Sequence, residues 1–164
     1  MNNRKVIEFD LSRKRPVKEI FSLLNNEDNL IDIPYFLSSV RAGFPASVND
    51  DYVEKTISVD RTLLKNPEYT FAVSVCGDSM EPFLFDGDII LVDKSQQIKP
   101  LNKIVVAWFD GGYTVKVLKI NNNVLELVSL NKSYKPIKVN KMLDDFYVAG
   151  VVTKVMRDID GWVF

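Results

Sequence analysis

Short apolar runs separated by turn residues dominate the chain from about residue 71 onward. Runs of this length, rich in Val, Ile and aromatic residues and bounded by Gly, Asn and Asp, are typical of β-strands. The runs that predict strands are residues 71–75, 89–92, 104–109, 113–120, 124–130 and 146–156. No helical stretch of about 12 residues interrupts them, which argues against parallel βαβ units. The pattern therefore predicts a mainly β fold, a strongly twisted antiparallel β domain.

Turn signals lie where such strands need connections. Residues 110–112 (Asp-Gly-Gly) predict a hairpin of the favoured kind, and the three asparagines at 121–123 predict a second. Residues 86–88 (Asp-Gly-Asp) precede another strand. These signals support hairpin connections between neighbouring strands.

The first 70 residues are less regular. Residues 12–24 predict one short amphipathic helix, with Ser12 as its N-cap and Pro16 in its first turn. Residues 41–47 look extended, because proline disfavours helix at the residue before it. We expect an irregular, partly helical N-terminal arm ahead of the β domain.

Composition narrows the class of protein. The chain has 164 residues, 46% hydrophobic and 26% charged, as in an ordinary globular protein of one domain plus an appendage. A net charge of −1 argues against electrostatic binding of nucleic acid by the domain as a whole. The beginning turns acidic too soon for a signal peptide, and the longest apolar run, 104–109, is far shorter than the roughly 20 residues that span a bilayer. We expect a soluble, cytoplasmic protein with no membrane association.

The chain contains no histidine and one cysteine, Cys76. Zinc and haem sites are therefore not expected, and we predict no metal and no cofactor. A group of carboxylates in the second half could suggest a Ca²⁺ site, but the EF-hand spacing is absent, so they are better interpreted as turn formers and surface charges. They are Asp78, Glu81, Asp86, Asp88 and Asp93.

Ser79 is the candidate nucleophile. It follows a glycine turn directly after an apolar run, as a nucleophilic serine would. A serine hydroxyl needs a neighbouring base, and without histidine a desolvated lysine is the best candidate. Lowering a lysine pKa from about 10.4 to about 7.4 raises the neutral fraction at pH 7 from about 0.04% to about 30%.

Strand alternation narrows the base to two lysines. Lys116 and Lys119 lie on opposite faces of the run at 113–120, and both faces are mostly apolar. Periodicity alone does not choose between them. The alternative is purely structural: Ser79 as a turn residue, the lysines solvated, and Cys76 as a small buried hydrophobe.

Several motifs in one order resemble the LexA/UmuD family of self-cleaving Ser-Lys proteins. The second half carries the string 77–82 (GDSMEP), then 86–93, then 110–118. The first half carries 42–45 (AGFP), which looks like the scissile region in its UmuD form, followed by 51–54. Residues 33–36 also resemble the segment ahead of the UmuD cleavage point. The resemblance covers about residues 31–157.

The resemblance implies a role for each matching residue. Ser79 would be the nucleophile and Lys116 its base, with the backbone N–H groups of Asp78 and Ser79 as the oxyanion hole. The scissile bond would join Ala42 to Gly43. Residues 1–42 would then be an arm removed by self-cleavage, and 43–164 a β-rich peptidase-like and dimerisation domain.

Within the family the match looks nearest to UmuD. The resemblance then implies a homodimer that cleaves itself on meeting a RecA-type filament in the SOS response. The product would join a UmuC-like subunit of an error-prone translesion DNA polymerase. The alternative is a LexA-like or phage-type autocleaving repressor, but residues 1–41 have room for one short helix, so no sequence-specific DNA binding is expected. A signal peptidase would need a membrane anchor, and an inactive interaction module would not need Ser79 and Lys116.

Overall fold

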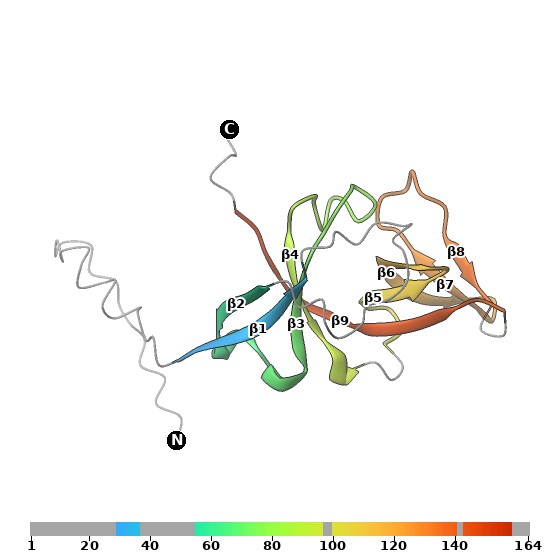
Figure 1. The fold of residues 1–164 in the computed structure, drawn as a ribbon. Coiled ribbons are helices and arrows are strands. Elements are labelled where there is room, and N and C mark those ends of the chain that lie inside the picture. Colours follow the sequence, from blue (N-terminus) through green and yellow to red (C-terminus); the bar gives the residue numbers. More distant parts are fainter. Residues whose placement is uncertain (1–28, 37–54, 97–99, 141–142, 159–164) are drawn as a thin grey trace, which may run out of the picture.

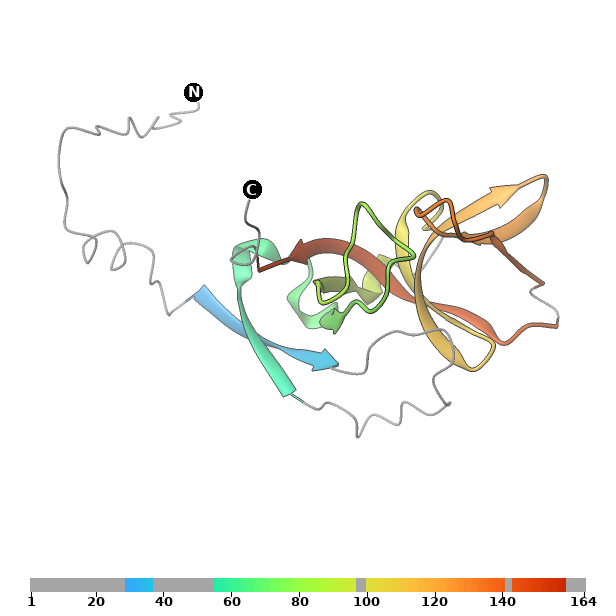
Figure 2. The same cartoon turned by 90° about the horizontal axis from the view of Figure 1, so that it is seen from above.

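The computed structural model describes residues 29–36, 55–96, 100–140 and 143–158, and these form one twisted sheet of nine strands (Figures 1 and 2). The order across the sheet is β2-β1-β3-β4-β9-β5-β6-β7-β8. The strands are β1 (Leu30–Phe36), β2 (Lys55–Asp60), β3 (Thr70–Ser74), β4 (Ile89–Asp93), β5 (Ile104–Phe109), β6 (Gly112–Asn121), β7 (Val124–Val128), β8 (Ile137–Val139) and β9 (Phe146–Met156). Short 3₁₀ turns occupy η2 (Arg61–Leu63), η3 (Pro67–Tyr69) and η4 (Lys94–Gln96). The prediction of a mainly β, twisted fold is confirmed.

The six predicted strands correspond to β3, β4, β5, β6, β7 and β9. The two predicted hairpin turns are present as well, and positive φ angles at Asp110, Gly111, Asn122 and Asn123 explain why those residue types stand there. Every strand pair is antiparallel except β1 with β3, which is parallel. This one pair departs from the antiparallel pairing expected from the sequence.

Residues 30–36 correct the expectation of an irregular first segment, because they form β1 inside the sheet. The sequence pattern does not predict this strand because of Pro34, since proline within an apolar run argues against a central strand. Pro34 is exposed and is paired with Thr56 of β2. The predicted helix at 12–24, the extended segment at 41–47 and the candidate scissile pair Ala42–Gly43 lie outside the described residues.

Three apolar clusters stabilise the sheet. The largest packs β3, β4, β5 and β6 against Val75, Met80 and Leu84 of the connection between β3 and β4. A second joins β5, β6, β7, β8 and β9, and a third joins β1, β2, β3 and β4. The first cluster therefore lies directly beneath the connection that carries Ser79. Among the described residues, no helix is long and apolar enough to cross a bilayer.

Candidate active site

Ser79 lies on the connection between β3 and β4, which is closed by backbone hydrogen bonds at its base. The Val75 N–H donates to the Asp88 carbonyl at 2.8 Å, and the Gly87 N–H donates to the Val75 carbonyl at 2.9 Å. Gly77 has φ +82°, a conformation that favours glycine, and its N–H donates to the Asp86 carboxylate at 2.7 Å. Asp86, at the other end of the same loop, thus fixes the glycine turn ahead of Ser79.

Two apolar side chains anchor the same loop from below. Met80, next to Ser79, is 1% exposed, and Leu84 is 2% exposed. The N–H groups of Phe83 and Leu84 both donate to the Met80 carbonyl, at 3.0 and 3.1 Å. Ser79 itself is half-buried, so its hydroxyl lies at the boundary between this core and the surface.

An ion pair ties the end of the loop to the end of β9. Asp88 is 2% exposed and accepts from Arg157 at 2.6 Å to each of its carboxylate oxygens. Burial raises the pKa of Asp88, but the hydrogen bonds from Arg157 and from the Phe85 N–H outweigh it and hold the pKa below its usual value. The Asp-Gly-Asp string therefore has a structural role, as predicted for turn formers, but Asp88 is buried, so the expectation of a surface charge is wrong for it.

Lys116 reaches Ser79 from β6. Its amine lies 2.7 Å from the Ser79 hydroxyl oxygen and donates to the Val115 carbonyl at 3.0 Å. The side chain is 8% exposed between the buried residues Val115 and Val117. Burial lowers the pKa of Lys116 from 10.5 to about 8, because the charged amine loses its hydration. About a tenth of such an amine is neutral at pH 7, enough for it to accept a proton.

The structure separates the two candidate lysines. Lys119 is exposed and is paired with Glu126 across β6 and β7, whereas Lys116 faces Ser79. Alternation alone left the choice open because β6 is buried on both faces as far as Leu118. A serine hydroxyl in hydrogen-bond contact with a buried amine of lowered pKa is the arrangement that activates a serine without histidine.

Known proteins resemble the chain in the region that holds this pair. A family model described as Peptidase S24-like matches residues 34–153, which include both Ser79 and Lys116. The LexA repressor of Alcanivorax borkumensis is 37% identical over 123 residues, 74% of this chain and 58% of that protein. The chain belongs to the Peptidase S24-like family. It spans less than two thirds of the length of that curated relative.

Membership of the Peptidase S24-like family confirms the expected family at its broad level. The nearer likeness to UmuD is not shown by these matches. The oxyanion donors expected at Asp78 and Ser79 lie on the Ser79 turn, and their role stays a prediction. Cys76 is half-buried three residues ahead of Ser79. Within the described ranges, no group of three or more Cys, Asp or Glu side chains is arranged to hold a metal ion.

Sequence reasoning missed Asn131, which contacts the Ser79 turn from the β7–β8 connection. Its backbone N–H donates to the Ser79 carbonyl at 3.1 Å, and its side-chain amide donates to the Asp78 carbonyl at 3.2 Å. The Tyr134 hydroxyl donates to the Asp78 carboxylate from the same connection. No local pattern signals these contacts, because Asn131 and Asp78 are 53 residues apart in the chain.

Asn131 holds both peptide groups that flank Ser79. The Asp78 carbonyl and the Ser79 N–H belong to one planar trans peptide group and point in opposite directions. A bond to that carbonyl therefore fixes the direction of the Ser79 N–H, which is one of the two expected oxyanion donors. Asn131 consequently orients the backbone on both sides of Ser79.

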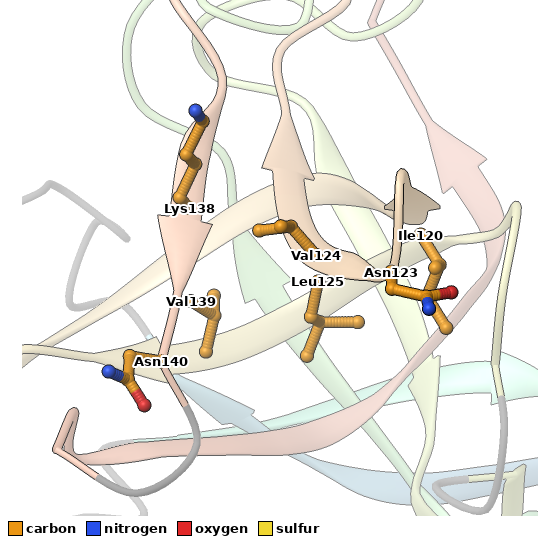
Figure 3. Close-up of a pocket in the computed structure, with 7 residues that line it drawn as sticks. All are labelled: Ile120, Asn123, Val124, Leu125, Lys138, Val139 and Asn140. Carbon is orange, nitrogen blue, oxygen red and sulfur yellow. The ribbon is translucent and has the colours of Figure 1, made fainter.

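A separate pocket of about 500 Å³ lies at the β6–β7 turn beside β8 (Figure 3). Its lining includes the apolar residues Ile120, Leu125 and Val139, and the Lys138 side chain extends away from them. Neither Ser79 nor Lys116 lines it. The pocket is therefore distinct from the candidate active site.

The lowered pKa of Lys116 is directly measurable. In a ¹³C-lysine NMR titration, we expect one side-chain resonance to titrate near pH 8, because burial disfavours the charged amine. That resonance should be missing from Lys116→Ala and present in Lys119→Ala. A Lys116 resonance that stays protonated above pH 10 would contradict the assignment.

Proposed function

We propose that Ser79 and Lys116 form a catalytic dyad with which the chain hydrolyses its own peptide bond between Ala42 and Gly43. The observation that carries the proposal is the 2.7 Å contact between the Ser79 hydroxyl and a buried lysine amine. Membership of a peptidase family supports the same chemistry. The cut would divide the chain into an arm, residues 1–42, and a peptidase-like and dimerisation domain, residues 43–164.

The chemistry follows from the roles of the two side chains. Neutral Lys116 accepts the Ser79 proton while the hydroxyl oxygen attacks the Ala42 carbonyl carbon. The N–H groups of Asp78 and Ser79 stabilise the negative charge on that carbonyl oxygen. The Lys116 ammonium then protonates the departing Gly43 amine, and water hydrolyses the Ala42–Ser79 ester to regenerate the serine.

The sheet topology supports a route from the candidate bond to the nucleophile. β1 and β3 run parallel with Phe36 opposite Val73, so the chain leaves both strands toward the same end of the sheet. Ala42 follows Phe36 by six residues (42 − 36), and Ser79 follows Val73 by six (79 − 73). Six extended residues span at most about 20 Å. The segment from Phe36 to Ala42 therefore has the same maximum reach as the segment from Val73 to Ser79.

The relative named LexA repressor favours a self-cleaving repressor as the biological role. In this reading, which goes against the expectation from residues 1–41 of no sequence-specific DNA binding, cleavage separates a DNA-binding part from the dimerisation domain, and a RecA-type filament stimulates the cut. The alternative reading is a UmuD-like homodimer whose cleaved form joins a UmuC-like error-prone polymerase subunit. The strings at 33–36 and 42–45 support that reading. Both roles use the same dyad and the same bond.

Self-cleavage is the first test. The purified protein should yield one cut, between Ala42 and Gly43, identified by mass spectrometry of the fragments. Its rate should rise about tenfold per pH unit at low pH and level off above about pH 8, because the neutral form of Lys116 is the base.

Three variants define the dyad. Ser79→Ala should abolish the cut, and Lys116→Ala should slow it by about 10²- to 10⁴-fold, the usual contribution of a general base. Lys119→Ala, an exposed lysine on the same strand, should cleave like the parent protein. Cleavage that persists in Ser79→Ala, or that occurs at another bond, would refute the proposal.

Asn131→Ala tests the orientation of the nucleophile. Loss of the side-chain bond to the Asp78 carbonyl should lower the plateau rate by about tenfold to a hundredfold through misalignment. The midpoint of the pH profile should stay where it is, because the burial of Lys116 is untouched. Lys132→Ala, exposed in the same connection, is the control. A moved midpoint with an unchanged plateau would mean that Asn131 acts through Lys116 instead.

DNA binding separates the two biological roles. A repressor predicts that intact Ser79→Ala protein enriches one sequence from a random duplex library, and that the cleaved parent protein does not. The UmuD-like role predicts no enrichment by either form and a complex of the cleaved form with a polymerase subunit. Enrichment by both forms equally would contradict both roles.

A further inference from the structure

β1 is an interior strand of the sheet, between β2 and β3 (Figure 1). It pairs with β2 from Leu30 opposite Asp60 to Tyr35 opposite Lys55. On its other side it pairs with β3 at Tyr35 and Phe36. β1 is therefore paired along most of its length with β2 and at its C-terminal end with β3.

The side chains of β1 are as firmly placed as its backbone. Ile33 is 1% exposed and packs with Val59, Leu64, Ala72 and Leu91, all of which follow residue 54 in the chain. Burial of such a large apolar side chain is a substantial contribution to the stability of a fold. Ile33 is thus a core residue supplied by the segment ahead of the candidate cut.

Aromatic and polar contacts extend this attachment. Phe36 packs edge to face on Phe71 of β3, with ring centroids 5.6 Å apart, and belongs to the rim of the cluster beneath the Ser79 connection. The Tyr35 hydroxyl is 2.7 Å from the Ser74 hydroxyl. The Ser58 hydroxyl donates to the Asp32 carboxylate at 2.5 Å. Every one of these contacts joins β1 to a residue beyond the bond between Ala42 and Gly43.

The cut itself removes none of these interactions. Ala42 and Gly43 lie in sequence between β1 and β2, so hydrolysis breaks the covalent connection and leaves the strand pairing in place. We propose that β1 stays seated between β2 and β3 after self-cleavage, so that the immediate product is a non-covalent complex of the two fragments. Release of the N-terminal fragment is then a separate step that withdraws β1 from the sheet. This inference rests on the proposed cleavage site.

Withdrawal of β1 is costly because of its interior position. It would expose the apolar partners of Ile33 and open the edge of β3. In the part of the chain that the structure describes, β2 pairs with no strand other than β1, so β2 would lose all of its strand pairing as well. Before the cut, β1 binding is intramolecular. Afterwards it depends on concentration, so retention should weaken on dilution.

The test compares the cleaved protein under native and denaturing conditions. After complete self-cleavage, we expect both fragments to co-elute in size-exclusion chromatography. Native mass spectrometry should show the mass of the intact chain, or of its dimer, plus one water for each chain. Denaturant should separate the fragments. Separate elution under native conditions would overturn the proposal.

Two matched substitutions locate the attachment. Ile33→Asp should lower the retained fraction by about tenfold or more, because it buries a carboxylate without a partner. Leu30→Asp makes the same chemical change on the same strand at a residue that is 54% exposed, and should retain the fragment. Retention that is equal in both variants would overturn the assignment to β1.

A peptide competition covers the case in which Ile33→Asp fails to fold. Excess synthetic peptide of residues 29–36 should displace the fragment from the cleaved parent protein, and the same peptide carrying Ile33→Asp should not. Displacement by both peptides would contradict reversible binding through β1. So would displacement by neither peptide, if the fragment also stays bound after long dilution.

A further variant separates this proposal from the proposed function. A recognition sequence for an added site-specific protease, inserted between residues 37 and 54 of Ser79→Ala, allows the connection to be cut without the dyad. Co-elution of those fragments supports the β1 seat even if the parent protein never cleaves itself. Separation of those fragments overturns the seat and leaves the self-cleavage proposal standing.

Discussion

The rest of the structure depends on one constraint: a lysine amine is buried beside a serine hydroxyl. β6 carries Lys116 inward until only 8% of it is exposed, and burial lowers its pKa to about 8. The unfolded chain, with an ordinary lysine pKa of 10.5, binds more protons than the folded chain between about pH 8 and pH 10.5. Stability therefore rises with pH through that window, and at neutral pH the buried amine lowers it.

The interactions around Ser79 offset this cost and set the geometry. The serine is held by its own loop through Asp86, by the core through Met80 and by a distant connection through Asn131. The ion pair of Asp88 with Arg157 fixes the end of that loop to β9. Several segments of the chain thus restrain one hydroxyl, which is how a fold pre-organises a reactive group at the expense of stability.

Sequence patterns predicted the parts of the fold that depend on local chemistry. β5 and β6 are apolar runs around an Asp-Gly turn, and alternation with turn residues identifies such strands. β1 was missed because Pro34 interrupts its pattern and its neighbours come from distant segments. Ser79 was predicted as the nucleophile from its glycine turn, and the absence of histidine directed the prediction of its base to a lysine. Choosing Lys116 over Lys119 by physics required knowing which face of β6 meets the Ser79 loop, and Asn131 required knowing how the β7–β8 connection folds back.

The position of β1 changes the meaning of the boundary between residues 42 and 43. The proposed cut would divide an arm from a domain, but the packing of the sheet shows no such division, because Ile33 belongs to the same core as Val59 and Leu91. An edge strand leaves a sheet by losing one ladder, whereas β1 must give up two and deprive β2 of its neighbour. In the proposed mechanism, the site around Ser79 would control hydrolysis of the bond, and the sheet would control separation of the fragments. The two steps would then respond to different variables: pH and alignment for hydrolysis, concentration and competing strands for separation.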